Sequence, residues 1–309
     1  MQRKIYSKLV EWKNQKCHKP LILNGVRQCG KTYILKEFGK NEFDSLAYIS
    51  CDSNETLQAV YAGGFDVPRI IRGLSALTGV DIIPGKTLIF LDEVQAFPKA
   101  IEALKYFCED APEYHIVVAG SLLGVALHEG VSFPVGKVQT LRLFPMDFGE
   151  FLVALGQKQL FELIKSGDES LINAFHEKLK ELLRQYYYVG GMPEVVKSYV
   201  ENKSLNNVRT LQNEILSNYA GDFSKHAPAN EVPRIEMVWK SLLGQLAKEN
   251  KKFVYGALRK GARAKDFEMA IQWLVDAGLV YKTNRVTKPE LSLKFYEDLS
   301  AFKLYLCDC

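Results

Sequence analysis

Residues 25 to 32 combine the residue types that hold phosphate groups. They read Gly25-Val26-Arg27-Gln28-Cys29-Gly30-Lys31-Thr32, which fits the Gly-x-x-x-x-Gly-Lys-Thr pattern. The two glycines permit backbone angles closed to other residues, so the loop can turn its N–H groups toward one anion. Lys31 would reach the β- and γ-phosphates of a nucleotide, and the Thr32 hydroxyl would hold Mg²⁺. The alternative interpretation is a chance glycine turn before a helix.

Two adjacent carboxylates, Asp92 and Glu93, follow the apolar run of residues 88–91. A buried strand that ends here would bring Asp92 beside the phosphates, where it can orient the Mg²⁺ shell. Glu93 could then polarise the attacking water as a general base. Taken alone, this pattern is more often a strand end that meets solvent. Downstream of a phosphate loop, we interpret it as catalytic.

A further polar residue, Ser121, follows the apolar run 115–120. It could contact the γ-phosphate or the attacking water, or it could cap a following helix. The six cysteines are scattered, without the spacing of a zinc site or a disulfide framework. We interpret Cys29 as a small side chain tolerated in the loop, with a redox switch as the less favoured alternative.

The surrounding pattern predicts the elements that would position these residues. Apolar runs predict strands at 21–24, 46–51, 88–91, 115–121 and 137–145, and helical spacing predicts helices at 3–14, 33–38, 54–61, 67–77 and 98–109. Strands that alternate with helices predict an α/β fold, a P-loop NTPase parallel sheet with helices on both faces.

The remainder of the chain is predicted to hold two further parts. Residues 151–222 show helical patterning, broken at 186–194, and we interpret them as an α-helical lid. Further on, we predict helices at 234–249 and 265–277, then a hairpin that pairs 279–281 with 291–296. Together these suggest a winged-helix-like unit. The predicted domains are therefore 1–150 (AAA-type nucleotide-binding core), 151–225 (helical lid) and 226–309 (winged-helix-like domain and the start of a truncated C-terminal domain).

Composition limits the environment and the partners. Apolar content of 47%, charged content of 25% and a net charge of +4 are ordinary for a globular protein. No apolar run approaches the ~20 residues of a membrane span and no secretory signal opens the chain, so we expect a cytoplasmic location without membrane contact. Basic residues at 259–265 could meet DNA, but acidic residues on the helix 265–277 oppose groove binding. A protein partner is favoured over DNA.

With these residues in hand, the chain resembles bacterial and archaeal AAA-superfamily ATPases whose C-terminal half is a domain of unknown function. The motifs that carry the resemblance are 25–32, 91–95, 119–121, 143–151, 190–195 and 302–308. The resemblance implies that Pro193 packs near the adenine and that Ser121 is a sensor of the γ-phosphate. It also implies a last domain beyond Cys309, which is expected to be missing from this chain.

One departure from the family concerns a trans-acting arginine. Gly136-Lys137 stands where the family commonly has Gly-Arg, and lysine lacks the planar fork of an arginine finger. Arg142 and Arg27 are the alternatives. Oligomerisation is compatible with this family.

Together, the motifs predict an ATP-binding, Mg²⁺-dependent AAA-type ATPase that acts as a conformational switch or motor. The alternative is a nucleotide-gated protein- or DNA-binding module with little turnover. GTP is less favoured, because no Asn-Lys-x-Asp signal is present.

Overall fold

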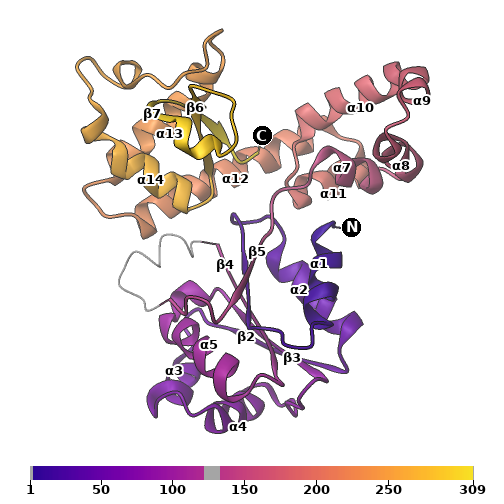
Figure 1. Ribbon diagram of the computed structural model, residues 1–309, viewed down its shortest axis with the longest axis vertical. Helices are drawn as coiled ribbons and strands as arrows, with labels where there is room; N and C mark the ends of the chain where they lie inside the picture. Colours follow the sequence, from indigo (N-terminus) through magenta and orange to yellow (C-terminus); the bar gives the residue numbers. More distant parts are fainter. Residues whose placement is uncertain (1–2, 122–132, 309) are drawn as a thin grey trace. The chain divides into compact units, whose positions relative to one another are not determined.

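The computed structural model describes residues 3–121 and 133–308 (Figure 1). The chain divides into two compact units, Met1–Lys203 and Ser204–Cys309. The boundaries predicted at residues 150 and 225 stay a prediction, because compactness alone does not define a functional domain. In the part of the chain that is described, no helix combines the length and apolar character needed to cross a membrane.

The first unit is built around a five-stranded sheet with the strand order β2-β3-β4-β1-β5. The strands are β1 (Leu21–Asn24), β2 (Ser45–Ser50), β3 (Thr87–Asp92), β4 (His115–Gly120) and β5 (Gln139–Arg142). All neighbouring strands are parallel, as predicted. Every residue of β3 and β4 is buried, because helices cover both faces of the sheet.

Helices lie on the two faces in separate groups (Figure 1). One group is α1 (Ile5–Lys13) and α2 (Lys31–Glu42); the other is α3 (Glu55–Ala62), α4 (Val67–Thr78) and α5 (Pro98–Asp110), the last preceded by the 3₁₀ turn η1 (Val94–Ala96). The alternation of side chains along β3 serves both groups. Ile89 and Leu91 join the apolar core beneath α3, α4 and α5. Leu88 lies on the opposite face, against Gly39 of α2.

Residues 148–202 continue the first unit as helices. They are α7 (Phe148–Ala154), α8 (Lys158–Ser166), α9 (Glu169–Ala174), α10 (His176–Val189) and α11 (Pro193–Asn202). Asp147 and Glu150 form a capping box that starts α7. The predicted break at 186–194 is shorter in the structure, because the tyrosines at 186–188 form the last turn of α10. Gly190, with φ of 76°, ends that helix.

The second unit consists of helices followed by a hairpin, which is a winged-helix-like arrangement. Its elements are α12 (Leu205–His226), α13 (Val232–Leu246), α14 (Glu268–Asp276), β6 (Val280–Val286) and β7 (Glu297–Leu306), with 3₁₀ turns η3 (Tyr255–Ala257), η4 (Ala264–Asp266) and η5 (Leu293–Tyr296). The predicted pairing of 279–281 with 291–296 is wrong: β6 pairs antiparallel with β7. The apolar residues that pack inward are Ala301, Phe302 and Leu304, whereas Leu291 is 99% exposed.

Candidate nucleotide-binding site

The carboxyl ends of three neighbouring strands bring the predicted residues to one edge of the sheet. Asn24 ends β1 and leads into the loop 25–30, from which α2 starts at Lys31. Asp92 ends β3, and buried Ser121 directly follows β4, which lies between β3 and β1. Ligands of open parallel sheets bind at this edge. The alternative for Ser121, as a helix cap, concerns residues 122–132, which lie outside the described residues.

The loop depends on its two glycines for different reasons. Gly30 has a φ of 94°, in the left-handed region that other residues avoid. Gly25 is needed for close approach, because a Cβ there would lie 2.4 Å from the carbonyl oxygen of Leu143. Gln28 also has a positive φ, of 66°. The pattern of the sequence therefore reflects a sharply turned backbone, which suits N–H groups converging on an anion.

Lys31 is buried with its ammonium group inside the loop. Its Nζ donates to the carbonyl oxygens of Gly25 and Val26, both at 2.8 Å. These two bonds use two of its three N–H groups and keep the charge at the centre of the loop. A cation held here attracts phosphate oxygens, which is the chemistry predicted for this residue.

Asp92 lies beside Thr32, as the Mg²⁺ prediction requires. The Thr32 hydroxyl donates to Oδ2 of Asp92 at 2.7 Å, and the backbone N–H of Glu93 donates to Oδ1 at 3.1 Å. Burial raises the pKa of the Asp92 carboxyl, with a smaller opposing effect from the Thr32 hydrogen bond. A carboxylate and a hydroxyl in contact are hard oxygen ligands of the kind that Mg²⁺ binds. The donor set therefore fits that ion.

Glu93 has a positive φ of 51°, and its side chain is held by a neighbour. Its Oε2 accepts a hydrogen bond from Nε2 of Gln95 at 2.5 Å. The half-buried carboxylate is thus close to Asp92 in sequence and in space, but it is engaged with an amide. While this hydrogen bond is present, the Oε2 atom of Glu93 is occupied by the amide of Gln95.

The other predicted residues have varied positions. Pro193 starts α11 and lies near the loop, since a Cβ on Gly30 would be 3.6 Å from its Cγ. Arg27 is exposed. Cys29 is fully buried, and burial raises the pKa of its thiol, which opposes thiolate chemistry. Lys137 forms an ion pair with Glu109 at 2.8 Å, and the guanidinium of Arg142 lies 5.2 Å from the Phe144 ring centroid.

Three residues near the site were missed by sequence reasoning. Tyr48 of β2 donates its hydroxyl to Oδ2 of Asp92 at 3.4 Å, and Gln95 binds Glu93 as described. Arg3 reaches the loop from the amino-terminal segment, where its Nη1 donates to the carbonyl of Cys29 at 3.0 Å. Tyr48 was findable, because the strand after a phosphate loop can lie beside the acidic strand. No pattern in the sequence indicated Arg3.

A parallel sheet with a glycine loop between β1 and α2 and an acidic end to β3 defines the P-loop class of nucleotide-binding folds. Residues 17–152 match the AAA domain family, and residues 180–309 match a family described as a domain of unknown function (DUF8612). The chain therefore carries an AAA P-loop ATPase domain followed by a C-terminal domain of unknown function. The domain of unknown function lies within the residues interpreted as lid and winged helix. The expectation of a further domain beyond Cys309 stays a prediction.

Solved structures support the fold. A Walker-type ATPase of Pyrococcus abyssi is similar over 99% of this chain and 93% of that one, with a TM-score of 0.59 and 13% identity. At this identity the likeness establishes the fold alone, and it confirms the predicted fold class. The match to the ORC1 protein of Aeropyrum pernix in complex with DNA covers 99% of this chain and 90% of that one, with 14% identity. Its TM-score of 0.36 is too low to support an argument. Comparison with curated protein sequences gives no match.

Proposed function

We propose that this protein binds ATP together with Mg²⁺ and hydrolyses it. The observation that carries the proposal is the contact between the Thr32 hydroxyl and the Asp92 carboxylate, beside the buried ammonium of Lys31. These residues come from segments sixty positions apart, and each has the chemistry that its place in a phosphate-transfer site requires. A simple glycine turn would not need the buried lysine or the acidic partner.

In the proposed mechanism, the loop N–H groups and Lys31 hold the phosphates of ATP. Thr32 and Asp92 would hold Mg²⁺, which when bound neutralises the charge that develops on the phosphate oxygens. Glu93 accepts a proton from the water that attacks the γ-phosphate in line. Ser121, buried at the end of β4, contacts that phosphate, and Pro193 packs near the adenine.

A nucleotide-gated module with little turnover is the second candidate, and the Gln95 contact favours it. Glu93 can act as a base only after its carboxylate leaves the amide of Gln95, 2.5 Å away. If that bond persists when ATP is bound, occupancy rather than turnover would carry the signal. The two candidates therefore differ in the state of one side chain.

The test is single-turnover hydrolysis by the wild-type chain beside Glu93→Gln, with ATP binding measured in parallel. An ATPase predicts equal binding by both proteins and a loss of about 10²-fold or more in the rate of the variant. Equal, negligible rates with intact binding would favour the module. Lys31→Ala should abolish binding in either case, and wild-type protein that binds neither ATP nor GTP would refute the proposal as a whole.

We further propose that nucleotide state is transmitted to a partner through the C-terminal unit. The sequence favours a protein partner, and the exposed side of α14 agrees: Met269 is 68% exposed and lies beside Glu268, while Asp276 is on the same helix. An apolar residue among acidic ones suits protein docking better than the DNA backbone.

A nucleic-acid partner is the alternative, and the hairpin rather than α14 supports it. Residues 1–203 hold equal numbers of basic and acidic side chains, so the formal charge of +4 resides in residues 204–309. A groove beside the hairpin is lined by Lys252, Arg285 and Lys303, and none of the described residues that line it is acidic. Binding of duplex and single-stranded DNA across a salt series decides the matter. Phosphate contact predicts a steep loss of affinity with salt that weakens in Lys303→Glu, whereas weak, flat binding would exclude it.

The oligomeric state decides whether Lys137 could contact a nucleotide bound to a second copy of the chain. Its ion pair with Glu109 is partly exposed, so it could rearrange if a second copy presented a γ-phosphate. Mass measurement in solution with and without Mg²⁺-ATP tests whether an oligomer forms. A monomer under all conditions would remove any role for Lys137 in trans.

A further inference from the structure

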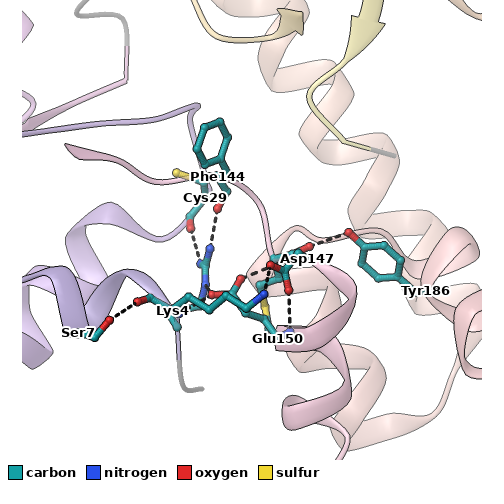
Figure 2. A network of polar contacts seen from close by, with 9 residues as sticks. Lys4, Ser7, Cys29, Phe144, Asp147, Glu150 and Tyr186 are labelled. Atoms are coloured by element: carbon teal, nitrogen blue, oxygen red, sulfur yellow. Dashed lines mark hydrogen bonds and ion pairs between the residues drawn. The ribbon is translucent and has the colours of Figure 1, made fainter. Parts of the chain in front are cut away.

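A buried arginine near the amino terminus joins the phosphate loop to the helices that follow the sheet. Arg3 donates from Nη1 to the carbonyl of Cys29 at 3.0 Å and from Nη2 to the carbonyl of Phe144 at 2.5 Å (Figure 2). Its Nε lies 3.2 Å from Oε1 of Glu150. These partners belong to the phosphate loop, to the connection after β5 and to α7. One side chain therefore bridges three segments.

The burial of this group makes its geometry strict. The side chains of Arg3 and Glu150 are only 6% and 8% exposed. Because water cannot solvate either charge, each needs the other as its partner. The planar guanidinium of arginine donates hydrogen bonds to two carbonyls while its charge lies beside the Glu150 carboxylate, which a lysine ammonium cannot reproduce. Glu150 is itself fixed, because Oε1 accepts from the backbone N–H of Lys4 at 2.6 Å and Oε2 from that of Asp147 at 3.3 Å.

The same network continues to α11. The N–H of Met146 donates to the carbonyl of Gly191 at 2.7 Å, and the Tyr186 hydroxyl donates to the carbonyl of Met146 at 2.8 Å. Pro193 then returns to the loop: a Cβ on Gly30 would lie 3.6 Å from its Cγ and 3.8 Å from Nη1 of Arg3. Arg3, the loop and the start of α11 thus share one contact region.

We propose that Arg3 is a positioning residue that couples the conformation of the phosphate loop to α7 and α11. The coupling rests on the proposed function, because ATP is the ligand that would rearrange the loop. Cys29 immediately precedes Gly30, so a rotation of the peptide that turns its N–H toward phosphate also turns the Cys29 carbonyl. Arg3 follows that carbonyl, and with it follow Phe144 and Glu150. The sheet supplies the fixed frame against which these parts move.

The test is hydrogen exchange of the full chain, with and without Mg²⁺-ATP, in wild type, Arg3→Lys and Lys4→Ala. Lys4→Ala is the matched control, because Lys4 Nζ pairs with Asp147 at the surface, where both side chains are half exposed. Wild type and Lys4→Ala should show slower exchange in α7 and α11 when ATP is bound. Arg3→Lys should bind ATP within about threefold of wild type, yet lose most of that nucleotide-dependent difference.

The outcomes distinguish a coupling role of Arg3 from a role in structural stability alone. If Arg3→Lys speeds exchange in α7 and α11 equally with and without ATP, and the nucleotide-dependent difference persists, Arg3 is only structural and the proposal is overturned. Should Arg3→Lys fail to fold, Glu150→Gln decides, because glutamine keeps the reciprocal cap of α7 but removes the charge partner. The same loss of response is expected there, and a retained response overturns the proposal. If wild type binds no ATP, the proposed function fails first and the coupling fails with it.

Discussion

Acid is expected to destabilise the first unit through a buried pair of histidines far from the phosphate loop. His18 and His115 stack with ring centroids 3.8 Å apart, and each is less than 10% exposed. His115 packs against Trp12 and Phe43, and its Nε2 contacts the carbonyl of Lys13 at 3.2 Å. Burial, aided by the proximity of His18, lowers the pKa of His115 from 6.5 to about 4. Burial also lowers the pKa of His18.

The direction of the change in unfolding free energy with pH depends on whether the folded or the unfolded chain binds more protons. In the folded chain His115 stays neutral down to pH of about 4, whereas in the unfolded chain it takes up a proton near pH 6.5. Stability that is complete above pH 6.5 is therefore lost progressively as the pH falls toward 4. At pH 5 this histidine alone removes about 2 kcal/mol from the free energy of unfolding, and His18 adds to the loss. The hydrogen bond to the carbonyl of Lys13 favours the protonated form of His115, and the smaller effect of the Lys13 ammonium opposes it; both are outweighed by burial.

The assay is urea unfolding at pH 7, 6 and 5, followed by the fluorescence of Trp12. The other tryptophans, Trp239 and Trp273, lie in the second unit, and replacing both with Phe makes the signal specific to the first unit. His115→Phe should unfold more easily at pH 7 but lose about 2 kcal/mol less between pH 7 and 5 than the parent does. His176→Gln is the control, because His176 is largely exposed. An unchanged pH dependence in His115→Phe would refute the reasoning.

Two further predictions concern the site, and a third concerns the stability of the first unit. Thr32→Val should raise the Mg²⁺ concentration needed for half-maximal hydrolysis about tenfold, whereas Thr32→Ser should not, because only the serine keeps a hydroxyl for Asp92. Gln95→Ala should speed single-turnover hydrolysis up to about tenfold without changing ATP affinity, because it frees Glu93; a slower rate would show that Gln95 assists instead. Gly191→Ala should destabilise the first unit by about 2 kcal/mol or more in thermal unfolding, because its Cβ would lie 2.1 Å from the carbonyl of Met146. Gly221→Ala, where a Cβ meets open space, is the control and should be neutral or stabilising.

The sequence predicted well those parts of the fold that local patterns specify. The apolar run of β3 and the glycine spacing of the loop each restrict the local backbone to few conformations, so the parallel sheet and the position of Asp92 were predictable. The hairpin was different, because both 291–296 and 301–306 contain enough apolar residues to form its second strand. Only packing against α13 distinguishes them, and that packing buries Phe302 and leaves Phe295 87% exposed.

The candidate site also contains residues that the sequence could predict and residues that it could not. Lys31, Thr32 and Asp92 could be found because their spacing follows from the chemistry of phosphate and Mg²⁺. Arg3 could not, because its role depends on contacts between segments that only the folded chain brings together. The roles of all these residues toward the nucleotide and Mg²⁺, those of Ser121 and Pro193 included, stay predictions.

The connection after β5 explains why the loop and the helices after the sheet should not move independently. At one end, the N–H of Leu143 donates to the carbonyl of Asn24 at 2.7 Å. The carbonyl of Leu143 lies so close to Gly25 that a side chain at residue 25 would not fit. At the other end, Met146 meets Gly191 in the same backbone-to-backbone manner. Contacts between backbones cannot be relieved by a change of rotamer, so a shift at either glycine must move the segment between them. We therefore expect a nucleotide that alters the loop at Gly25 to act on the start of α11 through residues 143–146. In the proposed coupling, Arg3 adds a second connection, to α7.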